Sequence, residues 1–268
     1  MNVLVKDLSD LHAMQLVFFR ALGTLVFMLP YMLYKKISVI GNNPKMLTIR
    51  SIVGFISIFT FFLAIQRTPL GPAISIRYLG PIFGAFFAYL FLKEKVSLAQ
   101  AASFGVAFSG VIVLKGFDLR IDNWSLALLL ISAVFIGIVF VMVRYLSSRE
   151  HPLTIINYFI VACVIISLFS FPLWTWPTPD QYLPLVAIGI AGLLGQVFMT
   201  NAFKLEETSV VAPFKYMELV WALMMTYFFF GETHTIETFM GMALIVAGML
   251  LNVCFKSRQT AIESNKKN

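Results

Sequence analysis

Long apolar segments alternate with short polar ones along the whole chain of 268 residues. An α-helix needs about 20 mostly apolar residues to cross the hydrocarbon core of a bilayer, and each of these segments is close to that length. The pattern therefore predicts nine transmembrane helices. Their expected ranges are Ala13–Tyr34, Thr48–Gln66, Pro69–Leu92, Ser97–Leu114, Ser125–Leu146, Leu153–Trp174, Tyr182–Phe203, Ser209–Phe230 and Ile236–Phe255.

The connecting segments are too short to form a domain outside the membrane. They carry turn-forming and charged residues, such as Lys35-Lys36 and Gly41-Asn42-Asn43-Pro44. Inside the apolar segments, polar residues do not alternate with apolar ones as they do in the strands of a membrane β-barrel. We therefore expect an all-α integral membrane protein.

The composition supports this interpretation. Hydrophobic residues make up 59% of the chain and charged residues 12%, whereas a soluble domain averages about 25% charged residues. The formal net charge of +7 would suit a nucleic-acid-binding protein, but the basic residues lie in the loops between apolar segments. We therefore expect no nucleic-acid partner. A small-molecule substrate and membrane lipids are the expected partners, and a homodimer stays open.

The distribution of Lys and Arg predicts the orientation, because cytoplasmic loops carry an excess of both. If the C-terminal tail and every second loop lie on one side, the opposite side holds only Lys6, Arg67, Lys115 and Arg120. We therefore expect the tail, residues 256–268, in the cytoplasm of a cell whose cytoplasmic membrane holds this protein. The tail's side then carries Lys35, Lys36, Lys45, Arg50, Lys93, Lys95, Arg144, Arg149, Lys204, Lys256, Arg258, Lys266 and Lys267.

The chain contains an internal repeat. A shift of 138 positions places Arg77 on Lys215 and Glu94 on Glu232, and it superimposes several aromatic residues and glycines, including Gly54 on Gly192 and Gly110 on Gly248. The second unit, residues 120–255, holds five predicted helices. Because five is odd, tandem copies must have opposite orientations, as in many secondary transporters.

The first unit, residues 1–119, holds only four complete helices. Its opening, Met1–Ser9, aligns with the end of the fifth helix of the second unit at Phe140–Ser147. The fold expected is therefore two inverted five-helix repeats, of which the first lacks most of its first helix. We expect that the reading frame continues upstream of Met1.

Two related stretches resemble the drug/metabolite transporter superfamily, and within it the EamA-type transporters. The first stretch runs from Tyr78-Leu-Gly-Pro to Tyr89-Leu-Phe-Leu-Lys-Glu94, and the second runs from Tyr216 to Tyr227-Phe-Phe-Phe-Gly-Glu232. Arg20 also resembles an arginine early in the second helix of that family. The resemblance implies ten helices in two inverted units, a central cavity, and secondary transport, often export, of amino acids, nucleotide-like metabolites or drugs.

Charged residues inside the apolar segments are the first candidates for a substrate site. A charge at the centre of a bilayer costs at least about 2.5–3.5 kcal/mol, so each one needs a reason. Arg77 and Lys215 occupy equivalent positions of the repeat, and Glu218 is the one acidic residue deep inside a segment. Glu218 lies three residues after Lys215 on the same helix face, so this pair has a structural explanation as well.

Arg77 lies beside an expected break in its helix. Pro81 has no N–H to donate to the carbonyl of Arg77, so the helix should kink there. An arginine beside a kink is more consistent with a cavity lining than with packing. Arg20, Tyr78, Tyr216 and Trp221 are secondary candidates for substrate binding, for which lipid contact or ordinary packing is an equally good explanation.

Nothing in the sequence indicates an enzyme. His12, His151 and His234 lie in separate loops without metal-ligand spacing, and Cys163 and Cys254 lie in apolar segments without partner spacing, so we expect no metal, cofactor or disulfide. Gly189, Gly192 and Gly195 recur at every third position and predict a close helix contact. The main alternative to a transporter is a membrane enzyme that modifies lipids or a lipid carrier, for which paired carboxylates near one leaflet would be needed.

Overall fold

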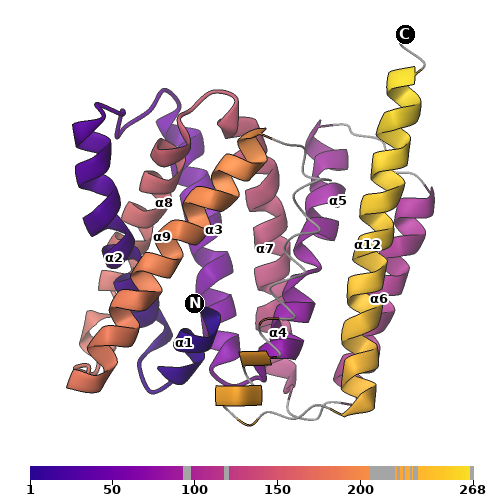
Figure 1. The fold of residues 1–268 in the computed structure, drawn as a ribbon, viewed down its shortest axis with the longest axis horizontal. Coiled ribbons are helices and arrows are strands. Elements are labelled where there is room, and N and C mark those ends of the chain that lie inside the picture. The colour runs from indigo at the N-terminus through magenta and orange to yellow at the C-terminus, as the bar shows by residue number, and fades with distance from the viewer. Residues whose placement is uncertain are drawn as a thin grey trace. The chain divides into compact units, whose positions relative to one another are not determined.

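The computed structural model is helical throughout the residues that it describes, which are 1–92, 98–117, 121–205, 221, 224–225, 227–229, 231 and 235–265 (Figure 1). Its helices are α1 (Asn2–Asp7), α2 (Ala13–Tyr34), α3 (Pro44–Ile65), α4 (Leu70–Arg77), α5 (Gly80–Leu92), α6 (Leu98–Phe117), α7 (Asn123–Ser147), α8 (Pro152–Leu168), α9 (Tyr182–Leu205) and α12 (Ile236–Asn265). Two short 3₁₀ helices, Phe171–Leu173 and Pro179–Gln181, join α8 to α9.

Six helical segments in the described part of the chain are long and apolar enough to cross a membrane. They are Ala13–Tyr34, Pro44–Ile65, Leu70–Phe91, Asn123–Ser147, Pro179–Ala202 and Ile236–Phe255. The segments Ala102–Val113 and Pro152–Leu168 are apolar but shorter. The predicted helix at 209–230 lies mostly outside the described residues. The predicted helix at 69–92 is divided into α4 and α5, and each of the other seven predicted helices overlaps one α-helix of the structure.

The chain folds into two compact units, and each unit combines segments from both halves of the sequence. Unit 1 consists of residues 1–66 and 139–205, and unit 2 consists of residues 67–138 and 206–268. The first part of α7 therefore belongs to unit 2 and its last part to unit 1.

In unit 1, helix α2 packs against both α8 and α9, and α3 packs against α8 (Figure 1). The N-termini of three of these helices are capped by side chains, which satisfy backbone N–H groups that have no partner within the helix. His12 Nδ1 accepts from Met14 N, His151 Nδ1 accepts from Leu153 N, and Asn43 Oδ1 accepts from Met46 N. Two of the three histidines therefore have a structural role at helix ends.

Glycines allow the closest helix contacts. In unit 1, a Cβ added to Gly23 of α2 would lie 2.8 Å from the Cα of Gly189 in α9. In unit 2, α6 packs along α12, and a Cβ added to Gly110 or Gly248 would lie within 2.7 Å of the opposite backbone. The predicted contact through the α9 glycines is thus confirmed for Gly189, whereas Gly195 has no atom within 4 Å of its added Cβ.

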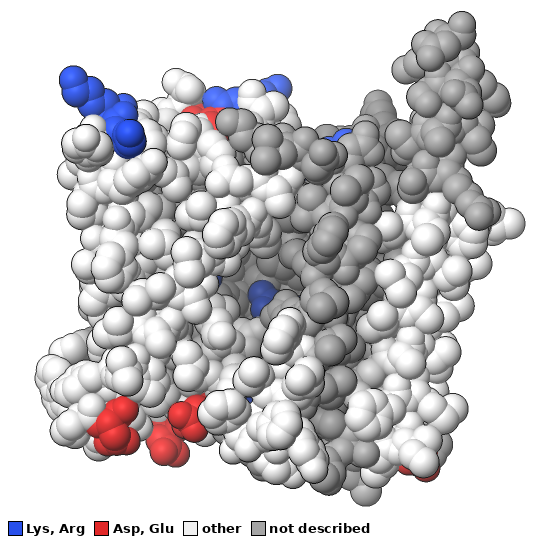
Figure 2. All heavy atoms as spheres, viewed as in Figure 1, with Lys and Arg blue, Asp and Glu red and all other residues white. Residues whose placement is uncertain are grey.

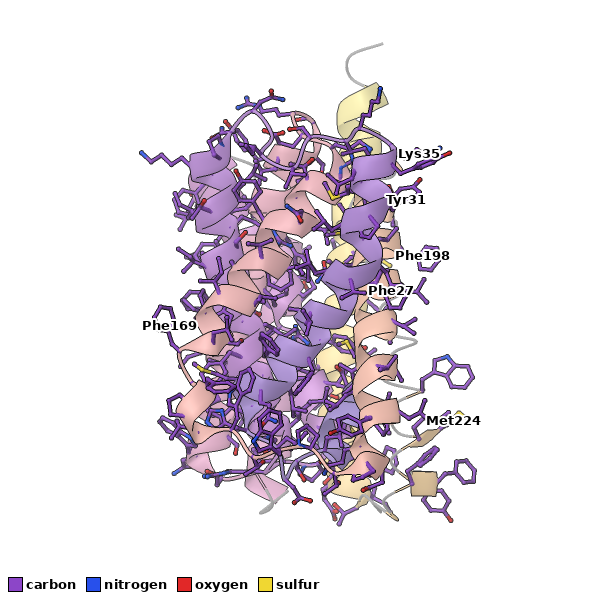
Figure 3. The ribbon with its side chains drawn as sticks, turned by 90° about the vertical axis from the view of Figure 1, so that its left-hand side faces the viewer. Phe27, Tyr31, Lys35, Phe169, Phe198 and Met224 are labelled. Carbon is purple, nitrogen blue, oxygen red and sulfur yellow. The ribbon has the colours of Figure 1, made fainter. Side chains whose placement is uncertain are left out.

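The outer surface of unit 1 is rich in aromatic side chains that point away from the helices (Figure 3). Phe27 and Tyr31 of α2, Phe169 after α8 and Phe198 of α9 are each at least half exposed. Exposure of this many large apolar side chains is unfavourable in water and favourable in contact with lipid. This surface is the one expected of a multi-pass membrane protein.

A buried carboxylate closes one end of unit 1. Glu150, which precedes α8, accepts hydrogen bonds from the backbone N–H of Asn42 at 2.8 Å and of Asn43 at 2.7 Å. Gly41 in the same loop has a φ of +69°, and an added Cβ would lie 2.7 Å from Glu150 Oε2. Glycine is required there because a side chain would be strained by both the backbone and the carboxylate.

Candidate functional site

Arg77 is the last residue of α4, at the break that the sequence predicts. Tyr78 and Leu79 form a turn, and α5 begins at Gly80. The N–H groups of Tyr78 and Leu79 bond to carbonyls within α4, and Pro81 offers no N–H to the carbonyl of Arg77. The predicted interruption is therefore confirmed. Arg77 is half-buried, and Tyr78 is buried.

The other residues predicted around Arg77 have different positions. Lys215, Tyr216 and Glu218 lie outside the described residues. Trp221 is described and is 54% exposed. The structure thus places Arg77 and Tyr78 together in unit 2 but does not describe the partners that the repeat assigns to them.

Arg20 lies in the interior of unit 1 and is only 2% exposed. Its Nε donates to Met1 Sδ at 3.4 Å. One turn further along α2, Thr24 Oγ1 bonds to the carbonyls of Arg20 at 3.0 Å and of Gly189 at 3.2 Å, which joins α2 to α9. Gly192 of α9 leaves room for the arginine, since an added Cβ would lie 3.1 Å from Arg20 Cγ.

Arg50 is placed differently from the sequence prediction. The prediction counted it among the basic residues of the cytoplasmic side, near the start of the predicted helix at 48–66, but it lies six residues inside α3 and is 2% exposed. The reason is the start of the helix, because Asn43 caps it before the apolar run and Pro44 occupies its first turn. At a rise of 1.5 Å per residue, the Cα of Arg50 is about 9 Å from the start of α3.

The two arginines meet at one aromatic ring. The Cζ of Arg50 lies 4.6 Å from the ring centroid of Phe159 in α8, and the Cζ of Arg20 lies 5.8 Å from the same centroid. Both distances are typical of cation–π contacts. The Cys163 thiol, one turn along α8 from Phe159, is buried.

The hydrogen-bonding capacity of Arg50 is only partly used. Among the residues that the structure describes, neither Nε nor Nη1 of Arg50 has a hydrogen-bond partner, although both atoms are buried. Glu150, the buried acidic residue of the described part of unit 1, bonds to the loop at Asn42 and Asn43 instead. This arrangement favours a negative charge between the helices of unit 1.

The described residues provide no candidate metal centre. No group of three or more His, Cys, Asp or Glu side chains that could hold a metal ion occurs in the described part of the chain.

Among the two buried arginines, the sequence analysis identified Arg20 as a candidate site residue and missed Arg50. The asparagine cap at Asn43 was the signal that would have started this helix at Pro44 and placed Arg50 further inside it.

Comparison with known proteins gives a family over nearly the whole chain. The model of the EamA-like transporter family matches residues 2–115 and 123–254. The pseudopaline exporter CntI of Pseudomonas aeruginosa is 32% identical over 93% of this chain and 89% of its own length. Human solute carrier family 35 member G1 is 29% identical over 92% of this chain and 73% of its own length.

More distant similarities agree. The S-adenosylmethionine uptake transporter of Rickettsia prowazekii is 22% identical over 93% of this chain and 86% of its own length. A protein of known crystal structure shares 18% identity and a TM-score of 0.70, with 96% of both chains covered. At that identity the structural similarity establishes the fold alone.

Proposed function

The chain belongs to the EamA-like transporter family, and we propose that this membrane transporter is a secondary active carrier of a small anionic or zwitterionic metabolite. Its substrate would be of the amino-acid, nucleotide-like or drug-like class. We favour export, because the relative at 32% identity is named an exporter. Another relative, at 22% identity, is named an uptake transporter, so direction is a matter for experiment.

Buried arginines are the observation that carries the substrate class. Arg20 and Arg50 are each 2% exposed inside helices that are long and apolar enough to span a membrane. Arg77 ends α4 beside the helix break. Because each such cation is costly in a membrane, a role in attracting a negative group explains their presence better than packing does.

The proposed architecture is two inverted repeats, residues 1–119 and 120–255, followed by the tail. The family model matches two segments with similar limits. A shift of 138 positions relates α2 to α8 and α3 to α9, so the contact of α2 with α9 has the contact of α8 with α3 as its counterpart. In unit 2, Gly110 approaches Gly241 and Ile245, and Gly248 approaches their equivalents Ser103 and Ala107.

The proposed substrate contacts include the residues that the repeat relates. Arg77 and Lys215 would bind the negative group, and Glu218 would balance their charge or carry a coupling proton. Arg20, Tyr78, Tyr216 and Trp221 would contribute secondary contacts.

We propose that the cytoplasmic end of unit 1 is the one where α2 ends and α3 and α8 begin. Its exposed basic residues among those described are Lys35, Lys36, Lys45, Arg144 and Arg149. The opposite end has Lys6 with Asp7, Asp10 and Asp180. Figure 2 shows this separation over unit 1, with blue at its upper edge and mainly red at its lower edge. A basic cytoplasmic end is the usual arrangement, and it agrees with a cytoplasmic C-terminus by the loop count.

Transport can be tested in proteoliposomes that contain the full-length chain. The probes are radiolabelled succinate, a labelled amino-acid mixture and labelled choline, each with and without an imposed pH gradient. We expect saturable movement of an anionic or zwitterionic probe, reduced at least about tenfold in Arg77→Gln, which loses a charge-assisted contact. Lys215→Gln and Glu218→Gln should show comparable losses, and Arg149→Gln, at an exposed position, should resemble the wild type.

Two results would contradict the proposal. If choline is the only probe transported, the substrate is a cation and the proposed anionic or zwitterionic class is wrong. Movement of a fluorescent lipid between leaflets, with none of the soluble probes transported, would favour a lipid carrier. If the three intramembrane variants fold and transport normally, those charges are structural and the substrate binds elsewhere.

A further inference from the structure

The interior of unit 1 holds two positive charges, those of Arg20 and Arg50. Arg20 and Arg50 are both 2% exposed, so neither guanidinium reaches an interface. A cation–π contact with Phe159 supplies about 2 kcal/mol at most when it is desolvated. Burial of an uncompensated charge costs several kcal/mol, so the contact with Phe159 does not by itself balance the charge of Arg50.

Both side chains extend toward the middle of the unit. Arg20 lies seven residues after the start of α2 and Arg50 six residues after the start of α3, which corresponds to about 10 Å and 9 Å along helices that run in opposite directions. Each helix has 22 residues, or about 33 Å, and the two helices run in opposite directions. The Cα atoms of Arg20 and Arg50 therefore lie in opposite halves of the length of unit 1. Their guanidinium groups nevertheless meet at Phe159.

Glycines accommodate both arginines. A Cβ added to Gly54 would lie 3.1 Å from the Phe159 ring and 3.7 Å from Arg50 Nη1, and a Cβ added to Gly192 would lie 3.2 Å from Arg20 Nε. Gly54 and Gly192 are 138 positions apart, which is the spacing of the internal repeat. The repeat therefore provides space at the two places where a guanidinium group packs.

Buried N–H groups of Arg50 point to a missing acceptor. Nε and Nη1 of Arg50 lack partners among the described residues, and Glu150 is already bonded to the loop at Asn42 and Asn43. A buried donor without a partner costs about 1–3 kcal/mol, and more when it is charged. A planar oxyanion would satisfy the fork-shaped donor set of a guanidinium group and offset its charge at the same time.

We propose that Arg20 and Arg50 together bind an oxyanion group of the substrate, a carboxylate or a phosphate, against Phe159 in the interior of unit 1, at a site separate from the contacts proposed for Arg77 and Lys215. The proposal rests on the transport function above and adds to it a site formed by α2, α3 and α8. Arg50 supplies the open donors, and Arg20 supplies a second charge. Phe159 and the two glycines fix where the guanidinium groups lie.

Thermal unfolding of the full-length protein in maltoside micelles, which contain no phosphate, tests the site without a known substrate. The probes are sodium succinate and sodium phosphate, with sodium chloride at equal ionic strength as reference. We expect either oxyanion to raise the midpoint of the wild type. Arg50→Gln should reduce the oxyanion affinity at least about tenfold, and Arg50→Lys, which keeps the charge without the fork, should fall between the two.

The variants also differ in the absence of oxyanion. If Arg50 is an uncompensated charge, Arg50→Gln should be at least as stable as the wild type in chloride, because the substitution removes a buried charge and keeps a polar group. A merely structural arginine would give a less stable variant. Arg149→Gln, at an exposed position, is the matched control and should respond to oxyanions like the wild type.

Three outcomes would overturn the proposal. They are no oxyanion shift in the wild type, an equal shift in Arg50→Gln and Arg149→Gln, and an Arg50→Gln variant that unfolds at a lower temperature or fails to fold. Stabilisation by added phosphatidylglycerol alone would assign the site to lipid and reject a substrate site. If the wild type transports a labelled anion but shows no oxyanion shift, the Arg20–Arg50 site fails and the transport function stands.

Discussion

Single glycines determine how closely the helices of unit 1 approach. Gly189, Gly192 and Gly195 follow one another on α9, yet their surroundings differ. Gly189 touches the backbone of Gly23, Gly192 lies against the flexible side chain of Arg20, and Gly195 faces open space. The three glycines thus differ in role. Gly189 allows close backbone contact, Gly192 leaves space for a charged side chain, and Gly195 does neither.

Alanine substitutions on α9 should separate these three situations. Gly189→Ala places a Cβ 2.8 Å from backbone that cannot yield, and overpacking of this kind costs about 1–3 kcal/mol. Gly195→Ala meets nothing and gains up to about 1 kcal/mol of helix propensity. We expect the unfolding midpoint in detergent to fall for Gly189→Ala and to stay level or rise for Gly195→Ala. Equal effects of the two substitutions would show that α2 and α9 do not pack as described.

At the scale of elements, the Glu150 carboxylate holds the loop between α2 and α3 and the start of α3. Polar contacts hold the connection between α2 and α3, residues 35–43, against the start of α8. Glu150 accepts two of the connection's backbone N–H groups, and Thr154 Oγ1 of α8 donates to the carbonyl of Ser38 at 2.6 Å. These contacts join the two loops at one end of unit 1.

Removal of the Glu150 carboxylate should open the α2–α3 loop locally. Glu150→Ala leaves two N–H groups without an acceptor and should cost about 1.5–3 kcal/mol, whereas Glu150→Gln keeps a neutral acceptor and should cost less. Trypsin cleavage after Lys35 or Lys36, followed by mass spectrometry, measures the opening directly. The expected order of cleavage rates is Glu150→Ala, then Glu150→Gln, then wild type.

Asp10→Ala, at an exposed position near the other end of unit 1, is the control and should match the wild type. Cleavage of Glu150→Ala at the wild-type rate would mean that the carboxylate does not hold the loop.

At the scale of the molecule, the exposed charged residues of unit 1 are separated between its two ends. Basic residues gather where α2 ends and α3 begins, and Asp7, Asp10 and Asp180 lie at the other end. In the positive-inside rule, Lys and Arg set the orientation and acidic residues contribute little, so the acidic residues at the other end are not separate evidence for it. The orientation proposed for the chain depends on that count.

Accessible cysteines should test the orientation in intact cells. Ser9→Cys and Ser148→Cys are near-isosteric changes at exposed positions near opposite ends of unit 1. In a background with both native cysteines replaced, an impermeant maleimide should label Ser9→Cys from outside and should label Ser148→Cys only after permeabilisation. The opposite pattern would reverse the proposed topology. Ser257→Cys, in the C-terminal region, should behave like Ser148→Cys.

The amino-acid sequence by itself determined the class of protein, the helical segments in the described part of the chain and the break at Arg77. Runs of about 20 apolar residues have one stable solution in a bilayer, and the missing N–H of Pro81 interrupts a helix whatever surrounds it. Family membership also follows from the sequence, because matching residues extend over nearly the whole chain. These properties depend on neighbours along the chain.

The tertiary structure alone decided which residues meet. Arg20 and Arg50 are 30 positions apart, and both reach Phe159 more than 100 positions later, because α2 and α3 pack against the same helix α8. Glu150 and the loop at Asn42 are brought together in the same way. Apolar helix faces offer many packing partners of similar energy, so the choice among them depends on side-chain fit and small residues such as Gly23 and Gly189. That choice cannot be read from hydrophobicity, and it makes Arg50, which the sequence analysis counted with the cytoplasmic basic residues, part of a buried pair.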